Sequence, residues 1–287
     1  IKNTEKIIRF SDQIAGVIQN AQLMKETEEA RKAADIEKGL ALVAQIDTEK
    51  EREKSENLLL NILPKEIANE LKENGKAEPV SYDSVSVMFT DFKGFTSIAN
   101  NLTPEELIKA LDTCFIQFDK ISEKFNLEKL KTIGDSYMCA GGIPVSNKTH
   151  AIDCVLAGFE IQHFIENMKK YNKDKFPFNE LRLGIHSGPL VAGVIGEKKF
   201  AYDVWGDTVN TASRMESSGS PGEINISGDT YNLIKDLFEC EYRGKVSAKN
   251  KGEIDMYFVH KIKANYSKDE KGEIPNKNFW EYYDSIS

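Results

Sequence analysis

The hydrophobic pattern of the chain changes once, just after residue 80. From about Ile7 to Asn57 the residues are mostly Ala, Glu, Lys and Gln without proline, which predicts one long helix. From residue 84 onward apolar and polar residues alternate, which is the pattern of a strand with one buried face. The apolar positions of this strand are Val85, Val87 and Phe89. The chain is therefore predicted to join a helical input to a folded domain.

The long helix carries only part of a coiled-coil pattern. Ile36, Leu40 and Val43 keep heptad spacing, but the polar residues Asp47 and Lys50 follow in the same seam. Two interpretations stay open. The segment is either a parallel coiled coil or a single helix whose charged side chains are solvated.

A short junction separates the helix from the domain. An apolar cluster precedes Pro64, which breaks the helix, and a second apolar face begins at Ile67. Gly75 and Pro79 are expected to end that second helix. The first cluster consists of Leu58, Leu59, Ile62 and Leu63.

The remaining pattern mixes helices with mostly antiparallel strands, an α+β fold class. A Thr-Pro-Glu-Glu start signal at 103–106 opens a helix, and a tight turn at Gly134 and Asp135 joins two strands. A long helix is predicted from His150 to Tyr171. The segments LRLGIH, PLVAGVIG, AYDVWG and EINIS read as strands, TVNTASRMESS and DTYNLIKDLF as helices, and MYFVHKI as the end of a hairpin. The tail after 262 is predicted to be polar and irregular. It contains an aromatic cluster that we expect to pack against another surface, formed by Phe279, Trp280, Tyr282 and Tyr283.

The composition narrows the class of protein. Of 287 residues, 40% are hydrophobic and 29% are charged, as in a globular protein with long polar helices. The net charge of −8 argues against nucleic acid as a partner, because phosphate-backbone binding needs a basic face. No run of about 18 apolar residues occurs, so we predict no membrane segment and a cytoplasmic location. Because the chain starts at Ile1 and not at Met, we expect a piece of a longer protein.

The cysteines and histidines do not predict a zinc site. The four cysteines are widely spaced without a CxxC pair, and the four histidines show no HExxH spacing. We therefore expect reduced cysteines within the core. They are Cys114, Cys139, Cys154 and Cys240.

Two acidic residues are the first candidates for chemistry. Asp91 ends a predicted buried strand within FTDFKGFT, and Asp135 lies at the hairpin tip in KTIGDSYM. If the strands are neighbours, the carboxylates converge, and divalent cations would relieve their repulsion. Each aspartate alone has an ordinary alternative as a turn or cap residue.

The order and spacing of four motifs resemble the class III nucleotide cyclases. They are FTDFKGFT, EKLKTIGDSYM, LRLGIHSGPLVAGVIG and AYDVWGDTVNTASRME. The resemblance implies a ferredoxin-like, palm-type catalytic domain. The junction resembles the transducer segment that precedes many such domains, and FSDQIAGVIQNAQLMKETEEA resembles the last helix of a GAF sensory domain. The expected organisation is a signalling helix at 1–56, a transducer joint at 57–80, the catalytic domain at 81–262 and a tail at 263–287.

The resemblance implies a role for each candidate residue near the phosphates. Asp91 and Asp135 match the two metal-binding acids, with the Phe92 carbonyl completing a site for two Mg²⁺ or Mn²⁺ ions. Arg182 matches an arginine that binds the terminal phosphates. The triphosphate cradle matches Lys93, Gly94, Phe95 and Thr96.

Further residues match the groups around the ribose, the reacting phosphorus and the triphosphate. Asn210 and Arg214, four apart on one predicted helix, match the pair that orients the ribose and stabilises the pentavalent phosphorus. Lys249 matches a triphosphate-binding lysine. The usual following glycine is Asn250 here, so Lys251 remains an alternative.

The base-reading positions favour adenine. Adenylate cyclases of the family use Lys with Asp or Thr, guanylate cyclases use Glu with Cys, and this chain has Lys131 and Asp203. A lysine donates to adenine N1 and an aspartate accepts from the exocyclic amine, whereas guanine presents the opposite polarity.

The expected function is therefore an adenylate cyclase. It converts ATP to 3′,5′-cyclic AMP and pyrophosphate through attack of the ribose 3′-hydroxyl on the α-phosphate, at sites shared across a homodimer and regulated by an upstream sensor. The acceptor of the hydroxyl proton stays open between Asp91 and a water molecule. The alternatives are a guanylate cyclase and a non-catalytic nucleotide-binding dimerisation module. A diguanylate cyclase is disfavoured because the chain has no GG[DE]EF segment.

Overall fold

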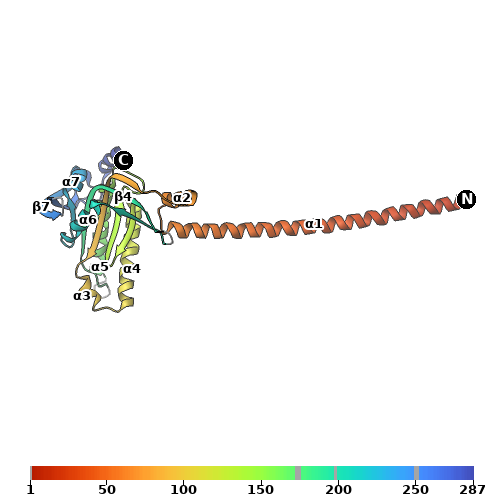
Figure 1. Cartoon of the computed structure of the whole chain (residues 1–287), viewed down its shortest axis with the longest axis horizontal. Coiled ribbons are helices and arrows are strands. Elements are labelled where there is room, and N and C mark those ends of the chain that lie inside the picture. The colour runs from red at the N-terminus through yellow and green to blue at the C-terminus, as the bar shows by residue number, and fades with distance from the viewer. Residues whose placement is uncertain (1, 172–175, 197–198, 249–251) are drawn as a thin grey trace. The chain divides into compact units, whose positions relative to one another are not determined.

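The computed structural model describes residues 2–171, 176–196, 199–248 and 252–287. The chain divides into two compact units, 1–61 and 62–287. The first unit is the helix α1 (Lys2–Leu60), drawn in red and orange in Figure 1. Its length confirms the predicted long helix. None of the helices in the described ranges is long and apolar enough to cross a membrane.

The apolar residues of α1 lie on its surface. Ile36, Leu40 and Val43 are 65%, 66% and 57% exposed in the single chain. Such residues gain stability only when a second surface covers them. The coiled coil therefore stays a prediction, and a partner helix is what it requires.

The second unit has an α+β fold, as the sequence predicted. Its helices are α2 (Lys65–Asn74), α3 (Phe95–Ala99), α4 (Pro104–Lys124), α5 (His150–Tyr171), α6 (Asp207–Ser217), α7 (Gly228–Ile234), η1 (Ala264–Tyr266) and α8 (Lys277–Ile286). Its strands are β1 (Val80–Phe92), β2 (Leu127–Ile133), β3 (Ser136–Gly141), β4 (Leu181–Ile195), β5 (Ala201–Trp205), β6 (Ile224–Ser227), β7 (Phe238–Ala248) and β8 (Gly252–Ile262).

One twisted sheet organises this unit. The strand order is β2-β3-β1-β4-β6-β8-β7, and β5 pairs with the far end of β4. All neighbours are antiparallel except β4 and β6, which are parallel. Strands β1 and β4 lie at the centre, so residues at their ends are positioned by the most extensively paired part of the fold.

The two strands predicted from LRLGIH and PLVAGVIG are one continuous strand, β4. Pro189 within it has no N–H to donate. The register of β1 shifts opposite this proline, between Tyr82 and Val85. The irregularity in β1 lets the pairing continue on both sides of Pro189, which the sequence pattern of β4 alone does not reveal.

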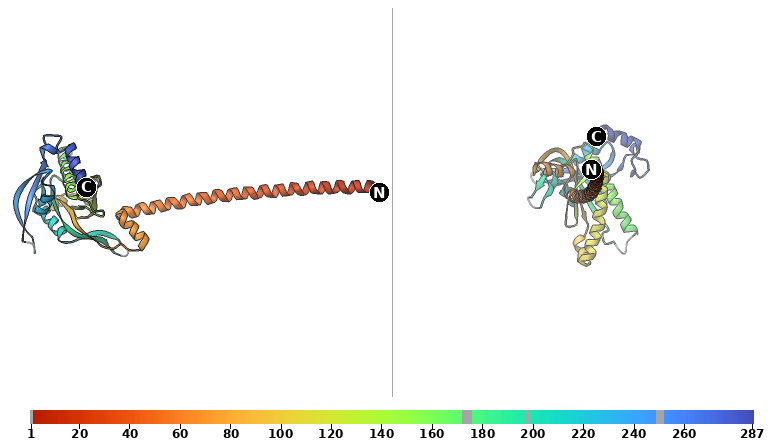
Figure 2. Two further views of the ribbon diagram at one scale, coloured as in Figure 1. Left: turned by 90° about the horizontal axis from the view of Figure 1, so that it is seen from above. Right: turned by 90° about the vertical axis from the view of Figure 1, so that its right-hand side faces the viewer.

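The sheet has a helix layer on each face. Leu183 and Gly184 are consecutive in β4, so they point to opposite faces. Leu183 packs in the main core beside α5, whereas Gly184 lies against the backbone of α6. Helices α4 and α5 lie side by side, as Figure 2 shows. We call the face that carries α6 the α6 face.

Local signals in the sequence set the ends of several helices. The Thr103 side chain accepts a hydrogen bond from the Glu106 backbone, and the Glu106 carboxylate accepts one from the Thr103 N–H. This capping box confirms the predicted start of α4. Gly75 ends α2 in the left-handed conformation, at φ 71°, as expected for a C-terminal glycine.

The tail is more regular than predicted. Instead of an irregular segment, it contains α8, which Asn276 caps by accepting a hydrogen bond from the Phe279 N–H. Phe279 is fully buried and its ring meets Phe238 edge-on, with ring centroids 5.9 Å apart. The Tyr283 hydroxyl donates to Asp153 of α5 at 2.7 Å. The aromatic cluster docks on the domain itself.

Candidate active site

The two candidate aspartates lie together at one end of the sheet. Asp91 is the second-last residue of β1, and Asp135 lies in the turn between β2 and β3, beside Gly134 at φ 64°. Because β3 pairs with β1, this turn comes next to the end of β1. The Phe92 N–H donates to Asp135 Oδ2 at 3.3 Å. The sheet thus brings together two acids that are 44 residues apart in the sequence.

The site places these carboxylates in electrostatic conflict. Partial burial, together with the neighbouring Asp91 charge, raises the pKa of Asp135 to about 6. A cation between the two acids would remove the repulsion. The Phe92 ring is buried and stacks on Phe178, with centroids 4.3 Å apart, so the end of β1 is anchored in the core.

Arg182 lies directly opposite Asp91 in the pairing of β1 with β4. Its Nη2 donates to Asp91 Oδ2, and its Nε is 3.0 Å from Oε1 of Glu216. Sequence reasoning assigned Arg182 to phosphate and did not find Glu216. Glu216 is part of the same motif as Arg214, two positions later, so its place in the motif could have pointed to it. Nothing in the sequence indicates that its side chain is buried.

Glu216 is held by the close approach of α6 to β4. A Cβ atom added to Gly184 would lie 1.9 Å from the Glu216 backbone nitrogen, so only glycine fits there. Arg182 and Gly184 share one face of β4, which brings the guanidinium to the end of α6. Burial, followed by the charges of Asp91 and Asp135, raises the pKa of Glu216 to about 7, against the opposing effect of Arg182.

The segment predicted as a triphosphate cradle forms a turn and a short helix. Gly94 is in the left-handed conformation, at φ 73°, and precedes α3, which begins at Phe95. Thr96 is exposed. The Lys93 side chain forms an ion pair with Glu180 at 2.7 Å. The segment therefore lies beside Asp91, with its lysine side chain bound to Glu180.

The lysine predicted to read the base is placed by an irregularity in β2. Lys129 pairs with Cys139 in register, but the register shifts before Lys131, which pairs with Met138. The extra residue at this β-bulge sends the two lysines to opposite faces. Lys129 bonds to Asp119 of α4 at 2.9 Å, on the face away from α6.

Lys131 therefore lies on the α6 face, where its Nζ donates to Asp203 Oδ2 of β5. Asp203 is paired with Gly193 of β4 and also accepts from the Val204 N–H at 2.9 Å. The two residues are 72 positions apart in the sequence, and the structure brings them into contact.

Asn210 and Arg214 both lie on α6. Asn210 is exposed, and the Arg214 Nη1 donates to the Ser247 carbonyl of β7 at 2.9 Å. Lys249 and its alternative Lys251 lie outside the described residues. The Arg214 contact nevertheless places its guanidinium close to the point where the described part of β7 ends.

The donor set is compatible with hard divalent cations, because it offers two carboxylates at one strand end. Within the described ranges, no three His, Cys, Asp or Glu side chains converge as ligands for one metal ion. The arginine bound to Asp91 occupies part of the site instead. The fit therefore rests on the two carboxylates that the pairing of β1 with β3 brings to one strand end, where burial and then the Asp91 charge raise the pKa of Asp135.

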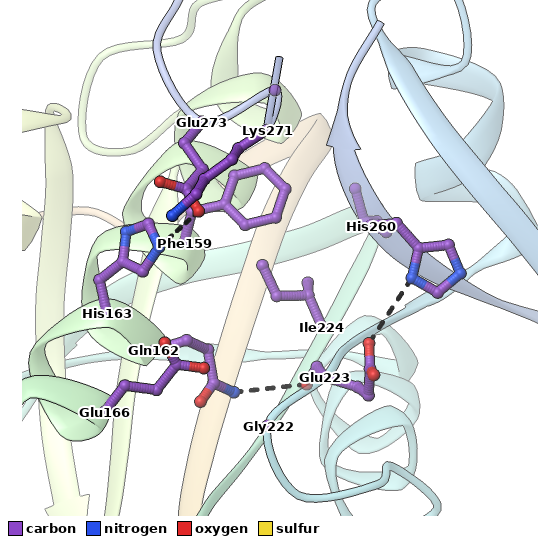
Figure 3. Close-up of a pocket in the computed structure, with 12 residues that line it drawn as sticks. Phe159, Gln162, His163, Glu166, Gly222, Glu223, Ile224, His260, Lys271 and Glu273 are labelled. Carbon is purple, nitrogen blue, oxygen red and sulfur yellow. Dashed lines mark hydrogen bonds and ion pairs between the residues drawn. The ribbon is translucent and has the colours of Figure 1, made fainter. Parts of the chain in front are cut away.

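A separate cavity of about 280 Å³ opens between α5 and the tail, shown in Figure 3. There His163 faces Glu273 at 3.3 Å, and His260 faces Glu223 at 3.8 Å. None of the candidate site residues that the structure describes lines this cavity. The chemistry of the motifs is thus confined to the end of the sheet and the α6 face.

Comparison with known proteins identifies the family. Residues 77–261 match the family model described as the adenylate and guanylate cyclase catalytic domain. The chain is 38% identical over 212 residues to an adenylate cyclase of Mycobacterium tuberculosis, covering 74% of this chain and 47% of the relative. It therefore spans about half the length of that relative.

Guanylate cyclases match equally well. The chain is 38% identical to human guanylyl cyclase C over 230 residues, 78% of this chain and 21% of that protein. The solved adenylyl cyclase CyaB from P. aeruginosa is 30% identical with a TM-score of 0.60, over 64% of this chain and 96% of that one. From its matched domain and its fold, the chain belongs to the class III adenylate and guanylate cyclase family.

Proposed function

We propose that the chain is an adenylate cyclase, which converts ATP to 3′,5′-cyclic AMP and pyrophosphate. The ion pair between Lys131 and Asp203 is the observation that carries this choice. It holds a cationic donor beside an anionic acceptor, and these two partners match adenine N1 and the exocyclic amine. Guanine would present a donor to the lysine and a carbonyl to the aspartate. Each mismatch leaves a polar group unpaired, which disfavours GTP.

Asp91, Asp135 and the Phe92 carbonyl are the groups that would hold two divalent cations. Such cations lower the pKa of a ribose 3′-hydroxyl and offset charge on a triphosphate. Arg182 and the 93–96 segment lie at the same strand end and would bind the phosphates. The acceptor of the hydroxyl proton is either Asp91 or water.

Asn210 and Arg214 would act on the ribose and on the reacting phosphorus. Their spacing of four residues along α6 directs both side chains to one side of the helix. A guanidinium suits this role because it can donate two parallel hydrogen bonds to the phosphoryl oxygens as their charge grows. Lys249 would add a further contact to the triphosphate.

We further propose that the active form is a homodimer with two shared sites. In this arrangement the acids of one protomer face Lys131, Asp203, Asn210 and Arg214 of its partner. The long helix would link the two catalytic domains to an upstream sensor, through a transducer joint at 57–80. The apolar residues exposed along α1 support a helical partner there.

Nucleotide turnover tests the proposed base choice. Purified chain is supplied with Mn²⁺ and either ATP or GTP, and the two cyclic products are quantified by chromatography. We expect cyclic AMP to predominate. The double variant Lys131→Glu with Asp203→Cys should move the preference toward GTP, because it reverses the polarity of both partners. Lys129→Glu is the matched control, since Lys129 lies on the opposite face of β2.

The second candidate is a guanylate cyclase, which the equal identity to guanylyl cyclase C and the 34% identity to a solved guanylate cyclase domain from Catenaria anguillulae favour. Predominant formation of cyclic GMP from GTP by the wild-type chain would support it. A chain that binds nucleotide but forms neither cyclic product, as a dimer with Mn²⁺ present, would instead be a non-catalytic dimerisation module.

A further inference from the structure

The guanidinium of Arg182 is shared between two carboxylates. One nitrogen donates to Asp91 Oδ2, and Nε is 3.0 Å from Glu216 Oε1. The Glu216 side chain is only 10% exposed, whereas those of Asp91 and Arg182 are 23% and 31% exposed. Arg182 thus lies between an accessible acid at the strand end and a more deeply buried acid on α6.

The contact with Glu216 is incomplete. Although the two atoms are close, Arg182 Nε and Glu216 Oε1 are both buried without a hydrogen-bond partner. Their distance permits a charge interaction, but their orientation does not make a hydrogen bond. Because buried polar groups in folded proteins are normally paired, this carboxylate has unused capacity for the guanidinium.

The packing of α6 against β4 anchors the backbone of Glu216, whose side chain is largely buried. Its backbone lies against Gly184, where even a single added carbon would clash. The flexible member of the group is therefore the long side chain of Arg182, which can change the carboxylate it bonds.

We propose that Glu216 is a positioning residue, and that Arg182 exchanges from Asp91 to Glu216 when a divalent cation takes the Asp91 carboxylate. The inference rests on the proposed function, because it takes Asp91 as a metal-binding acid. Glu216 offers a second acceptor for the displaced guanidinium. Arg182 then stays at the strand end as a fixed positive charge, while Asp91 becomes free to bind the cation.

Direct binding of Mn²⁺, without nucleotide, tests the exchange. Free Mn²⁺ is measured by electron paramagnetic resonance for the wild type, Glu216→Asp, Glu216→Gln and Arg182→Ala. Glu216→Asp keeps the charge but shortens the reach, so Arg182 remains on Asp91. We expect Glu216→Asp and Glu216→Gln each to weaken Mn²⁺ binding by at least about threefold. Arg182→Ala should bind Mn²⁺ at least as tightly as the wild type.

The decisive comparison combines the substitutions. In the Arg182→Ala background, Glu216→Asp should change Mn²⁺ affinity by less than about twofold, because the guanidinium is gone. Glu223→Gln, an acid of the separate cavity, controls for the loss of one charge. Thermal unfolding of every variant identifies those that do not fold, and the charge-preserving Glu216→Asp keeps the test available if Glu216→Gln is unstable.

Two results would overturn the exchange. One is wild-type Mn²⁺ affinity in Glu216→Asp, and the other is an equal loss with and without Arg182, which would mean that Glu216 acts on the cation by its own charge. Either result leaves the proposed function intact when the wild type still binds Mn²⁺ and forms cyclic AMP. A wild type that binds no Mn²⁺ and forms no cyclic product overturns both.

Discussion

At the residue scale, the surroundings of Asp135 disfavour its ionised form. Its burial and the charge of Asp91 raise its pKa to about 6, so the folded protein holds a strained carboxylate at neutral pH. Native structures retain such unfavourable groups mainly where function requires them. The stability and the activity of the protein should therefore respond in opposite directions when this charge is removed.

Asp135→Asn tests this opposition. We expect cyclic AMP formation to fall at least about 100-fold, because one of the two acids proposed to bind metal is lost. Without divalent metal, the variant should unfold at the same temperature as the wild type or higher, because one of two repelling charges is gone. Activity assays and calorimetry in a chelator check the two halves. A variant that is both active and less stable would contradict the assignment.

His150 predicts how the protein responds to acid. It is 2% exposed, hydrogen bonded to Ser84 and Ser86, and its burial lowers its pKa to about 4. In the unfolded chain a histidine takes up a proton near pH 6.5, whereas in the folded chain His150 stays neutral down to about pH 4. The contribution of neutral His150 to the free energy of unfolding is therefore complete above pH 6.5 and is lost as the pH falls to 4. The loss should be about 3 kcal/mol for a shift of this size.

His150→Gln isolates this contribution. Urea unfolding of the variant and the wild type at pH 7 and pH 4 should show the stability difference shrinking by about 3 kcal/mol toward pH 4. The comparison is needed because Asp153, whose pKa burial raises to about 6, acts in the opposite direction in both proteins. A difference that stays constant with pH would disprove the role of His150.

Residue types and their order predicted most of the candidate site, and the reason is chemical. Asp91, Asp135 and Arg182 lie in short motifs whose strands are neighbours, so their convergence at one strand end follows from local pairing. Glu216 was missed because its burial depends on Gly184, a contact between elements that no local pattern records.

At the scale of elements, β-bulges change which face of the sheet a side chain lies on, so the alternation in the sequence predicts the strand but not the face of each residue. The strand pattern of β2 was predicted, but a strict alternation would put Lys129 and Lys131 on the same face. The register shift between them is set by pairing with β3, and it is not visible in the composition of β2. The continuity of β4 through Pro189 likewise depends on its neighbour β1.

The tail helix α8 is an element whose contribution can be measured. Phe279 is fully buried against Phe238, so Phe279→Ala should cost about 3–5 kcal/mol of unfolding free energy. Trp280→Ala is the matched control, because Trp280 is 42% exposed and should cost clearly less. Denaturant titration of both variants provides the measurement. Equal costs would mean that α8 does not dock as described.

At the scale of the whole molecule, the proposed sharing of sites has a direct test. Asp135→Ala and Arg214→Ala, each expected to be inactive alone, are mixed after separate purification, unfolded together and refolded. A mixed dimer would contain one undamaged site, so up to about one quarter of wild-type activity should return, by random pairing of protomers. Mixing two batches of Asp135→Ala serves as the control. No recovery from folded, dimeric protein would rule out shared sites.

Gly184 has a mechanical consequence for how such an enzyme can be controlled. A lone hydrogen atom separates the strand that carries Arg182 from the helix that carries Asn210 and Arg214. Because the strand and the helix are in direct backbone contact at this point, we expect them to move together. Regulation would then act by changing the orientation of one protomer relative to the other. A loss of packing between β4 and α6 within a protomer would abolish activity and would not regulate it in a graded way.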